Sequence, residues 1–182
     1  MRIIAGILKG RRLQAPPPGY TRVRPTSDRA REALFSILQR WPRGAFLDLF
    51  AGTGAVALEA WSRGYAPVAC VEREAMALDC IKANARGTGV QVLARDVRRL
   101  GESAFPPQAV LFADPPYDAS ADFWEVLAPR LGGWLDPRGV LVWETGKGVA
   151  LPAPEGMEEL EVRCYGAAEF HLFRVADPSA AP

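Results

Sequence analysis

The sequence predicts an α/β protein with a mostly parallel sheet, because apolar strand patterns alternate with amphipathic helix patterns along most of its 182 residues. Two strand patterns end in loops with ligand-binding character, Asp48–Gly54 and Asp114–Tyr117. Open sheets of this class bind ligands at the carboxyl ends of their strands. We therefore expect two ligands side by side at one edge of the sheet.

Residues 1–43 form a basic arm in front of the sheet. Arg2–Leu13 alternates around two glycines, as in a short strand pair with turns, and Pro16–Gly19 is a stiff connector. Thr26–Asp28 offers N-cap side chains to a helix that ends near Arg40 and packs on the main domain. The arm has ten Lys or Arg and two acidic residues, net +8, whereas residues 44–182 carry net −7. This asymmetry indicates a bound polyanion, although arginines that only keep an edge soluble remain an alternative.

The main domain is expected over residues 44–176, followed by a frayed tail at 177–182. Its short connections predict parallel strands with right-handed crossovers. The last two strand patterns follow each other without a helix, which predicts an antiparallel hairpin. The expected strands are 45–49, 68–71, 90–93, 110–113, 140–144, 158–165 and 169–175, and the expected helices are 54–63, 75–86 and 123–131.

The chain shows no secretory or membrane pattern, since no apolar stretch reaches about 18 residues, and we expect a cytoplasmic protein with no membrane partner. Cys70, Cys80 and Cys164 lack paired spacing, which predicts buried free thiols and no metal site. His171 is the only histidine and no G-x-S-x-G elbow exists, so it is expected to be structural or exposed.

The loop Gly52-Thr53-Gly54 lets the main chain approach a ligand while the next helix points its amino terminus at it. The spacing Gly52-x-Gly54-x-x-Ala57, with Glu72 twenty residues after Gly52, also fits the dinucleotide fingerprint. An NAD-dependent oxidoreductase is therefore the serious rival to any other assignment.

Three acidic residues favour a different cofactor. Asp48 suits a cationic amino group better than a pyrophosphate, Glu72 can accept ribose hydroxyls, and Asp96 can accept an adenine amino N–H. An amino acid, a ribose and an adenine in a row describe S-adenosyl-L-methionine. The candidate cofactor-binding residues of the main domain are Asp48, Phe50, Ala51, Gly52, Gly54, Glu72 and Asp96.

Asp114-Pro115-Pro116-Tyr117 forms the candidate catalytic loop. The prolines fix φ and lack N–H groups, so their carbonyls point in set directions. If the Asp114 carboxylate and the Pro115 carbonyl accept the N–H bonds of an exocyclic amine, the nitrogen lone pair faces the methyl donor. Tyr117 can stack on the extruded base, which contributes roughly 1–3 kcal/mol. Glu144 ends another strand and can lie at the edge of the site formed by this loop. Tyr165 is expected to have a packing role.

The chain resembles the Asp-Pro-Pro-Tyr class of S-adenosylmethionine-dependent amino methyltransferases, and more narrowly the RsmD family. The resemblance implies a Rossmann-like class I methyltransferase with a seven-stranded, mostly parallel sheet and a reversed last strand. It also implies that Arg24 and Thr26 lie near the cofactor, and that the substrate is guanine N2 in 16S rRNA, at guanine-966, within an assembling small subunit. Tyr165–Ala168 departs from the family, because its turn lacks the expected polar residues. The matching segments are Arg2–Arg11, Arg24–Phe35, Asp48–Ala55, Leu58–Gly64 and Asp114–Tyr117.

The loop alone does not choose the acceptor, since this class also modifies DNA and protein. The chain has no room for a DNA target-reading domain, and a protein substrate would not require a basic arm, so we expect RNA, no DNA and a monomer. A non-catalytic RNA-binding module remains a further alternative. The expected phosphate contacts are Lys9, Arg11, Arg12, Arg22 and Arg29, with Arg24 as an additional cation.

Overall fold

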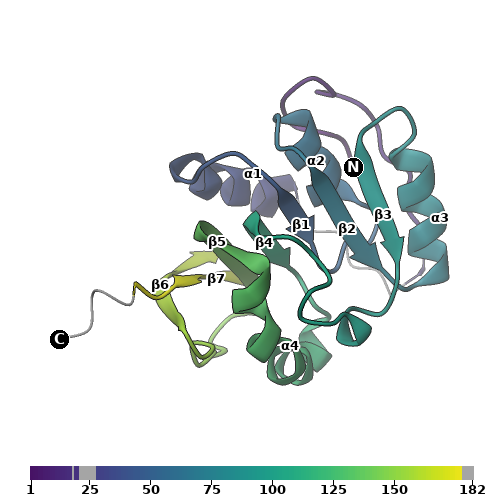
Figure 1. The fold of residues 1–182 in the computed structure, drawn as a ribbon. Coiled ribbons are helices and arrows are strands. Elements are labelled where there is room, and N and C mark those ends of the chain that lie inside the picture. The colour runs from purple at the N-terminus through teal and green to yellow at the C-terminus, as the bar shows by residue number, and fades with distance from the viewer. Residues whose placement is uncertain (18, 21–27, 178–182) are drawn as a thin grey trace.

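A computed structural model describes residues 1–17, 19–20 and 28–177. Its centre is one seven-stranded sheet with the order β3-β2-β1-β4-β5-β7-β6 (Figure 1). Strands β1 to β5 run parallel, while β7 is antiparallel to both β5 and β6. The predicted fold class, the reversed last strand and the terminal hairpin are confirmed. The strands are β1 (Phe46–Asp48), β2 (Val68–Glu72), β3 (Val90–Ala94), β4 (Gln108–Ala113), β5 (Leu135–Gly146), β6 (Met157–Tyr165) and β7 (Ala168–Val175).

Helices cover both faces of the sheet (Figure 1). Successive strand side chains point to opposite faces, so Phe46 packs with α1 and α2 while Leu47 packs with α4. Ile81 of α3 joins the cluster around Phe46. The helices are α1 (Asp28–Ile37), α2 (Ala55–Ser62), α3 (Ala75–Asn84) and α4 (Ser120–Trp134), with 3-10 turns η1 (Leu38–Arg40), η2 (Val97–Arg99) and η3 (Tyr117–Ala119).

The arm differs from its prediction in one respect. Arg2–Leu13 contains a single antiparallel bridge, between Arg2 and Arg12, instead of a strand pair. Gly6 and Gly10 both have positive φ, so the chain turns too tightly for longer strands. The helix expected to end near Arg40 is present as α1 followed by η1, and its apolar stripe is buried in the core. The expected cap residues Thr26 and Ser27 lie outside the described residues.

Two elements extend beyond their predicted bounds. Helix α4 runs from Ser120 to Trp134, beyond the expected 123–131 at both ends, and the residues at its two ends are buried. Strand β5 begins at Leu135, ahead of the expected 140, with an irregular register to β4 at its start, where the Asp136 carboxylate accepts the Arg138 N–H at 2.8 Å.

The isolated titratable residues have structural surroundings. His171 is buried on β7, with Nδ1 2.9 Å from Glu159 Oε1 and Nε2 3.2 Å from Thr145 Oγ1, as a structural histidine should be. The prediction of buried thiols is correct for Cys70 only: Cys80 is half-buried, and Cys164 is exposed beside Glu169 on the hairpin. None of the helices in the described part of the chain combines the length and apolarity needed to cross a membrane.

Candidate active site

The strand register brings the two predicted loops together. Asp48 at the end of β1 is aligned with Phe112 of β4 on one side and with Cys70 of β2 on the other. Asp114 and Glu72 therefore lie two residues further along the neighbouring strands, on either side of Asp48. All three carboxylates are at the same edge of the sheet, which is where parallel strands present ligand-binding loops.

A cavity of about 1080 Å³ lies at this edge. Most of the predicted cofactor and catalytic residues line it, together with Ala30 of α1. The sequence patterns missed Arg73 and Arg95, which follow the ends of β2 and β3, as well as Phe123 and Tyr165, the second of which was expected only to pack. The predicted residues that line the cavity are Asp48, Phe50, Ala51, Gly52, Glu72, Asp96, Asp114, Pro115, Pro116 and Tyr117, with Glu144 at its edge.

Asp48 is almost completely buried, and its Oδ1 accepts the Phe50 N–H at 3.2 Å. Burial raises the pKa of Asp48 to about 8, and the nearby charges of Asp114 and Glu72 also raise it, against hydrogen bonding from the Phe50 N–H. A buried carboxylate of this kind gains most from a cation placed beside it. The site is therefore suited to a positively charged ligand group.

Glu72 joins the glycine loop to the end of β2. Its carboxylate accepts main-chain N–H bonds from Gly52 at 2.7 Å, Arg73 at 2.7 Å and Glu74 at 2.8 Å. An ionised carboxylate offers about four acceptor positions. Glu72 can thus accept one further hydroxyl without losing a main-chain contact, and acceptance of two hydroxyls requires a shared position.

Asp96 caps η2 and lies between two arginines. Its oxygens accept from Arg73 Nη1 at 2.9 Å and from Arg98 Nη2 at 2.6 Å, and it also accepts the Arg98 main-chain N–H at 3.0 Å. Hydrogen bonding from Arg98 holds the pKa of Asp96 well below its usual range. The expected contact with an adenine amino group requires one of these exposed arginines to move.

Gly54 has a packing role. It adopts φ +79° at the start of α2, and a Cβ there would lie 2.5 Å from Cγ1 of Ile81. The residue therefore allows the glycine loop to rest on α3, and it does not line the cavity itself. Gly54 would therefore influence cofactor binding indirectly, by fixing the position of Gly52 in the same loop.

The Asp-Pro-Pro-Tyr loop is fixed at both ends. Pro115 is buried, and the Pro116 carbonyl accepts the Ala119 N–H at 3.0 Å as the chain turns into η3. The Tyr117 hydroxyl donates to Glu144 Oε1 at 3.2 Å, while 38% of the tyrosine stays exposed. The loop therefore presents an aromatic side chain at the mouth of the cavity, tied to the neighbouring strand.

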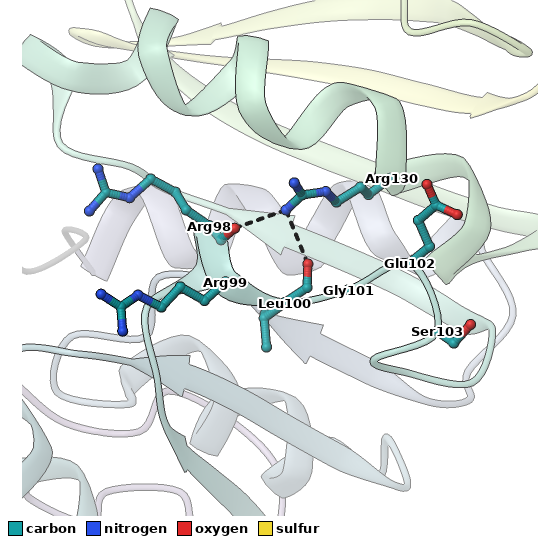
Figure 2. A pocket seen from close by; sticks show the side chains of 7 residues that line it. All are labelled: Arg98, Arg99, Leu100, Gly101, Glu102, Ser103 and Arg130. Carbon is teal, nitrogen blue, oxygen red and sulfur yellow. Dashed lines mark hydrogen bonds between the residues drawn. The ribbon is translucent and has the colours of Figure 1, made fainter.

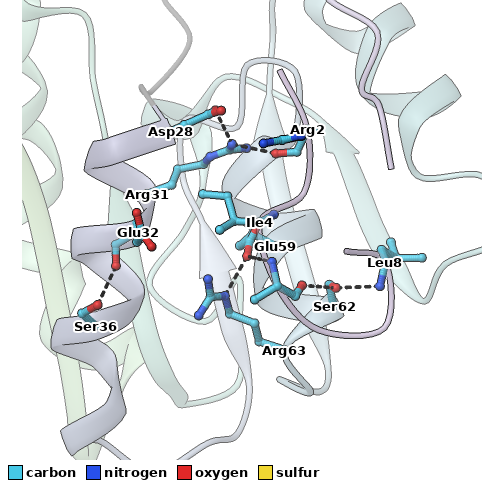
Figure 3. Close-up of polar contacts among 11 residues, drawn as sticks. Arg2, Ile4, Leu8, Asp28, Arg31, Glu32, Ser36, Glu59, Ser62 and Arg63 are labelled. Atoms are coloured by element: carbon cyan, nitrogen blue, oxygen red, sulfur yellow. Dashed lines mark hydrogen bonds and ion pairs between the residues drawn. The ribbon is translucent and has the colours of Figure 1, made fainter. Parts of the chain in front are cut away.

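The arm is anchored on α2 by a buried carboxylate (Figure 3). Glu59 is fully buried and accepts the N–H groups of Ile4 at 2.7 Å and Ala5 at 2.9 Å. The Arg63 Nε donates to the same carboxylate at 2.7 Å. One side chain thus satisfies two main-chain donors of the arm and an ion pair on its own helix.

Ser62 makes a second anchor one turn further along α2 (Figure 3). Its hydroxyl donates to the Ala5 carbonyl at 2.6 Å and accepts the Leu8 N–H at 2.9 Å. A Cβ at Gly6 would lie 1.8 Å from the Ser62 carbonyl oxygen, so only glycine fits between these contacts. The segment Leu58–Gly64 therefore positions the arm.

Asn84 connects the arm to the glycine loop. Its amide pairs with both main-chain groups of Gln14, accepting the N–H at 2.7 Å and donating to the carbonyl at 3.0 Å. The same Nδ2 donates to the Thr53 carbonyl at 3.0 Å. One side chain thus links the arm to the loop that lines the cavity.

Those predicted RNA contacts that the structure describes do not line the cavity. Lys9, Arg12 and Arg29 are exposed. Arg11 instead donates through Nη2 to the carbonyls of Asn84 at 2.9 Å and Arg86 at 3.0 Å, so it packs the arm on the end of α3. Arg22, Arg24 and Thr26 lie outside the described residues, and their assigned roles stay predictions.

Comparison with known proteins gives a consistent assignment. The family model described as "Conserved hypothetical protein 95" matches residues 1–174. The chain is 32% identical to ribosomal RNA small subunit methyltransferase D of Escherichia coli K12, over 84% of this chain and 78% of that protein. It belongs to the RsmD family.

Two further comparisons cover nearly the whole chain. The Haemophilus influenzae ribosomal RNA small subunit methyltransferase D is 29% identical over 96% of this chain and 93% of that protein. The structure of a hypothetical protein from Thermus thermophilus superposes with a TM-score of 0.80 at 34% identity, covering 96% of this chain and 99% of that one. The family assignment favours methyl transfer over the hydride transfer that the glycine spacing had left open.

Proposed function

We propose that this methyltransferase transfers a methyl group from S-adenosyl-L-methionine to the exocyclic N2 amino group of a guanine in 16S rRNA, at guanine-966 in an assembling small subunit. The names of the Escherichia coli and Haemophilus influenzae relatives support ribosomal RNA as the substrate. The single structural observation that carries the proposal is the position of Asp48 and Asp114, on neighbouring strands that border one cavity.

The residues of the cavity fit the cofactor. The buried carboxylate of Asp48 would face the cationic amino acid part, Gly52 would allow close approach, and Glu72 would accept a ribose hydroxyl. S-adenosyl-L-methionine supplies an electrophilic methyl group on a sulfonium. The cavity of about 1080 Å³ also leaves space for a nucleobase beside it.

Asp114 and Pro115 would hold the acceptor. The Asp114 carboxylate and the Pro115 carbonyl accept the two N–H bonds of the exocyclic amine, which leaves the nitrogen lone pair directed at the methyl group. Placement of this kind can lower a barrier by about 7–11 kcal/mol at best. Positive charge that develops on the nitrogen is stabilised by Asp114, which also takes the released proton.

Tyr117 would stabilise the extruded base. Its exposed ring offers a stacking surface at the mouth of the cavity, and its hydroxyl is held by Glu144. Removal of a base from its stack costs a few kcal/mol, which stacking on an aromatic side chain offsets in part. The loop thus combines positioning, charge stabilisation and base capture in four residues.

Methyl transfer to protein-free 16S rRNA and to small-subunit particles lacking this modification tests the proposal. We expect N2-methylguanosine at guanine-966, detected by nuclease digestion and mass spectrometry. Asp114→Ala should abolish transfer while calorimetry still detects S-adenosyl-L-methionine binding. Asp122→Ala, an exposed acidic residue on α4, is the matched control and should retain activity.

Three results would contradict parts of the proposal. Methylation at another position or atom would reject the assigned target. RNA binding without any methyl incorporation by the unmodified protein would identify a non-catalytic RNA-binding module. Binding of NAD in place of S-adenosyl-L-methionine in the calorimeter would favour the oxidoreductase alternative.

A further inference from the structure

A second hollow, of about 620 Å³, lies between η2 and α4 (Figure 2). Three of its seven lining residues are arginines, Arg98, Arg99 and Arg130, and Glu102 is the only acidic residue among the seven. We call it the arginine hollow. Its lining carries net positive charge, and it is separate from the basic arm on which the sequence placed the RNA contacts.

The arginine hollow adjoins the cofactor cavity. Arg95, Asp96 and Val97 line the cavity, and the next residue, Arg98, begins the lining of the hollow. The Arg98 guanidinium lies 5.5 Å from the ring centroid of Phe123, which also lines the cavity. The two depressions therefore share a wall formed by η2 and the start of α4.

The lining is held in place by hydrogen bonds. Arg130 Nη1 donates to the carbonyls of Arg98 at 2.9 Å and Leu100 at 3.0 Å (Figure 2). At the end of α4, the Nε1 of buried Trp134 donates to the carbonyls of Gly101 at 3.2 Å and Glu102 at 2.7 Å. The remaining N–H groups of Arg130 make no hydrogen bond to any residue that the structure describes, and a planar guanidinium held in this way loses little freedom on binding.

Two of the three arginines have no acidic partner among the described residues. Arg98 forms an ion pair with Asp96. Arg99 and Arg130 form no ion pair within the part of the chain that the structure describes. Two guanidinium groups without an acidic partner among the described residues, both on residues that line one hollow, favour an anion, and phosphate is the anion whose geometry they match best.

We propose that the arginine hollow binds the phosphate backbone of the RNA substrate about four nucleotides from the target base, with Arg99 and Arg130 as the contacting residues. This rests on the proposed function, because it assumes an RNA substrate. Helix α4 begins at Ser120, directly after η3 and the Asp-Pro-Pro-Tyr loop, and Arg130 follows ten residues later, about 15 Å along the helix. At 3.4 Å per phosphate in a stacked strand, that distance corresponds to about four nucleotides.

The test measures binding of a protein-free 16S rRNA transcript as a function of KCl concentration. Each lost phosphate contact on a single strand should make the negative slope of log K against log [salt] shallower by about 0.7. Arg99→Ala should therefore show this loss and about fivefold weaker binding at 0.1 M salt, and Arg99→Glu a larger one, while Arg99→Lys retains the slope. The matched control is Arg138→Ala, which removes an arginine whose side chain is 87% exposed at the start of β5.

The outcomes separate this inference from the proposed function. Equal slopes for Arg99→Ala, Arg138→Ala and the unmodified protein, with methyl transfer retained, would overturn the arginine hollow as an RNA site and leave the proposed function intact. Weaker binding only to particles that contain ribosomal proteins, with no change on the bare transcript, would also overturn it and indicate a protein contact. If the unmodified protein bound neither the transcript nor the small-subunit particles, the proposed function would instead be rejected. Arg99→Ala should keep its affinity for S-adenosyl-L-methionine, because Arg99 does not line the cavity.

Discussion

Tyr117 donates a hydrogen bond of 3.2 Å to Oε1 of Glu144, across the boundary between β4 and β5. The contact is possible because Ala113 at the end of β4 is in register with Trp143 of β5. The residues that follow these two therefore lie side by side at the same edge of the sheet. Glu144 is buried and Tyr117 is partly exposed. The bond therefore fixes a solvent-facing ring to the rigid part of the sheet.

Removal of this bond should have a smaller effect than removal of the ring. Tyr117→Phe keeps the aromatic surface, so we expect a loss of methyl-transfer efficiency below tenfold. Tyr117→Ala loses base stacking worth roughly 1–3 kcal/mol, which corresponds to about 5- to 150-fold. Steady-state kinetics with RNA as the varied substrate measures both. A Tyr117→Phe variant as inactive as Tyr117→Ala would show that the hydroxyl, and not the ring, is essential.

The raised pKa of Asp48 makes cofactor binding depend on pH. In the empty cavity the carboxyl has a pKa of about 8, and a cationic ligand favours its ionised form. Binding should therefore release a proton, and affinity should increase as the pH rises from 6 to 8 and then level off. Calorimetry in buffers with different ionisation enthalpies measures the proton directly. An affinity that is flat over this range would mean that Asp48 does not face the cation.

Asp48 should also lower the stability of the unliganded protein at neutral pH. Its folded pKa of about 8 is above its ordinary value of 3.8, so the folded state holds the proton more tightly than the unfolded state. Stability thus declines as the pH rises from about 4 to 8. Asp48→Asn removes this penalty, and its melting temperature should exceed that of the parent protein by several degrees at pH 8 but not at pH 4. Thermal unfolding at the two pH values checks this, and a variant less stable than the parent at pH 8 would contradict it.

Glu59 should be the main anchor of the arm. Glu59→Ala leaves two main-chain N–H groups and Arg63 without their acceptor. Loss of one partner from such a buried network costs about 3–5 kcal/mol, which for a chain of this size lowers the melting temperature by about 10 °C. Calorimetric unfolding measures the shift, with exposed Glu32→Ala as control. Faster tryptic cleavage at Lys9 should accompany the lower melting temperature. An unchanged cleavage rate and melting temperature would show that Ser62 alone is sufficient to hold the arm on α2.

Arg11 and Arg12 are adjacent but should behave differently. Arg12 is exposed, so Arg12→Ala should lower the salt dependence of RNA binding by about 0.7 per lost contact and leave stability unchanged. Arg11 is bonded to the carbonyls at the end of α3, so Arg11→Ala should mainly lower stability. Thermal unfolding and salt-dependent binding measured on both variants separate the two roles. The reverse pattern would place the RNA along α3.

Local sequence patterns were sufficient for the order of the elements and for the residues at the strand ends. Asp48 and Asp114 each follow an apolar run, and that placement depends only on chain order and on the tendency of parallel strands to carry ligand loops at their carboxyl ends. The reversed hairpin followed from the absence of a helix between its strands. Boundaries were less accurate where buried residues extend an element beyond its sequence pattern, as at both ends of α4.

Contacts between distant residues were decided by the tertiary structure. Arg11 and Arg12 look alike in the sequence, yet only Arg11 reaches the carbonyls at the end of α3, 73 and 75 residues away. Arg99 and Arg130 became one basic surface because η2 packs against α4, a relationship with no local signature. A residue type and its neighbours along the chain determine which chemistry is available. The packing of separate elements determines which of those groups are already engaged and which remain open to a ligand.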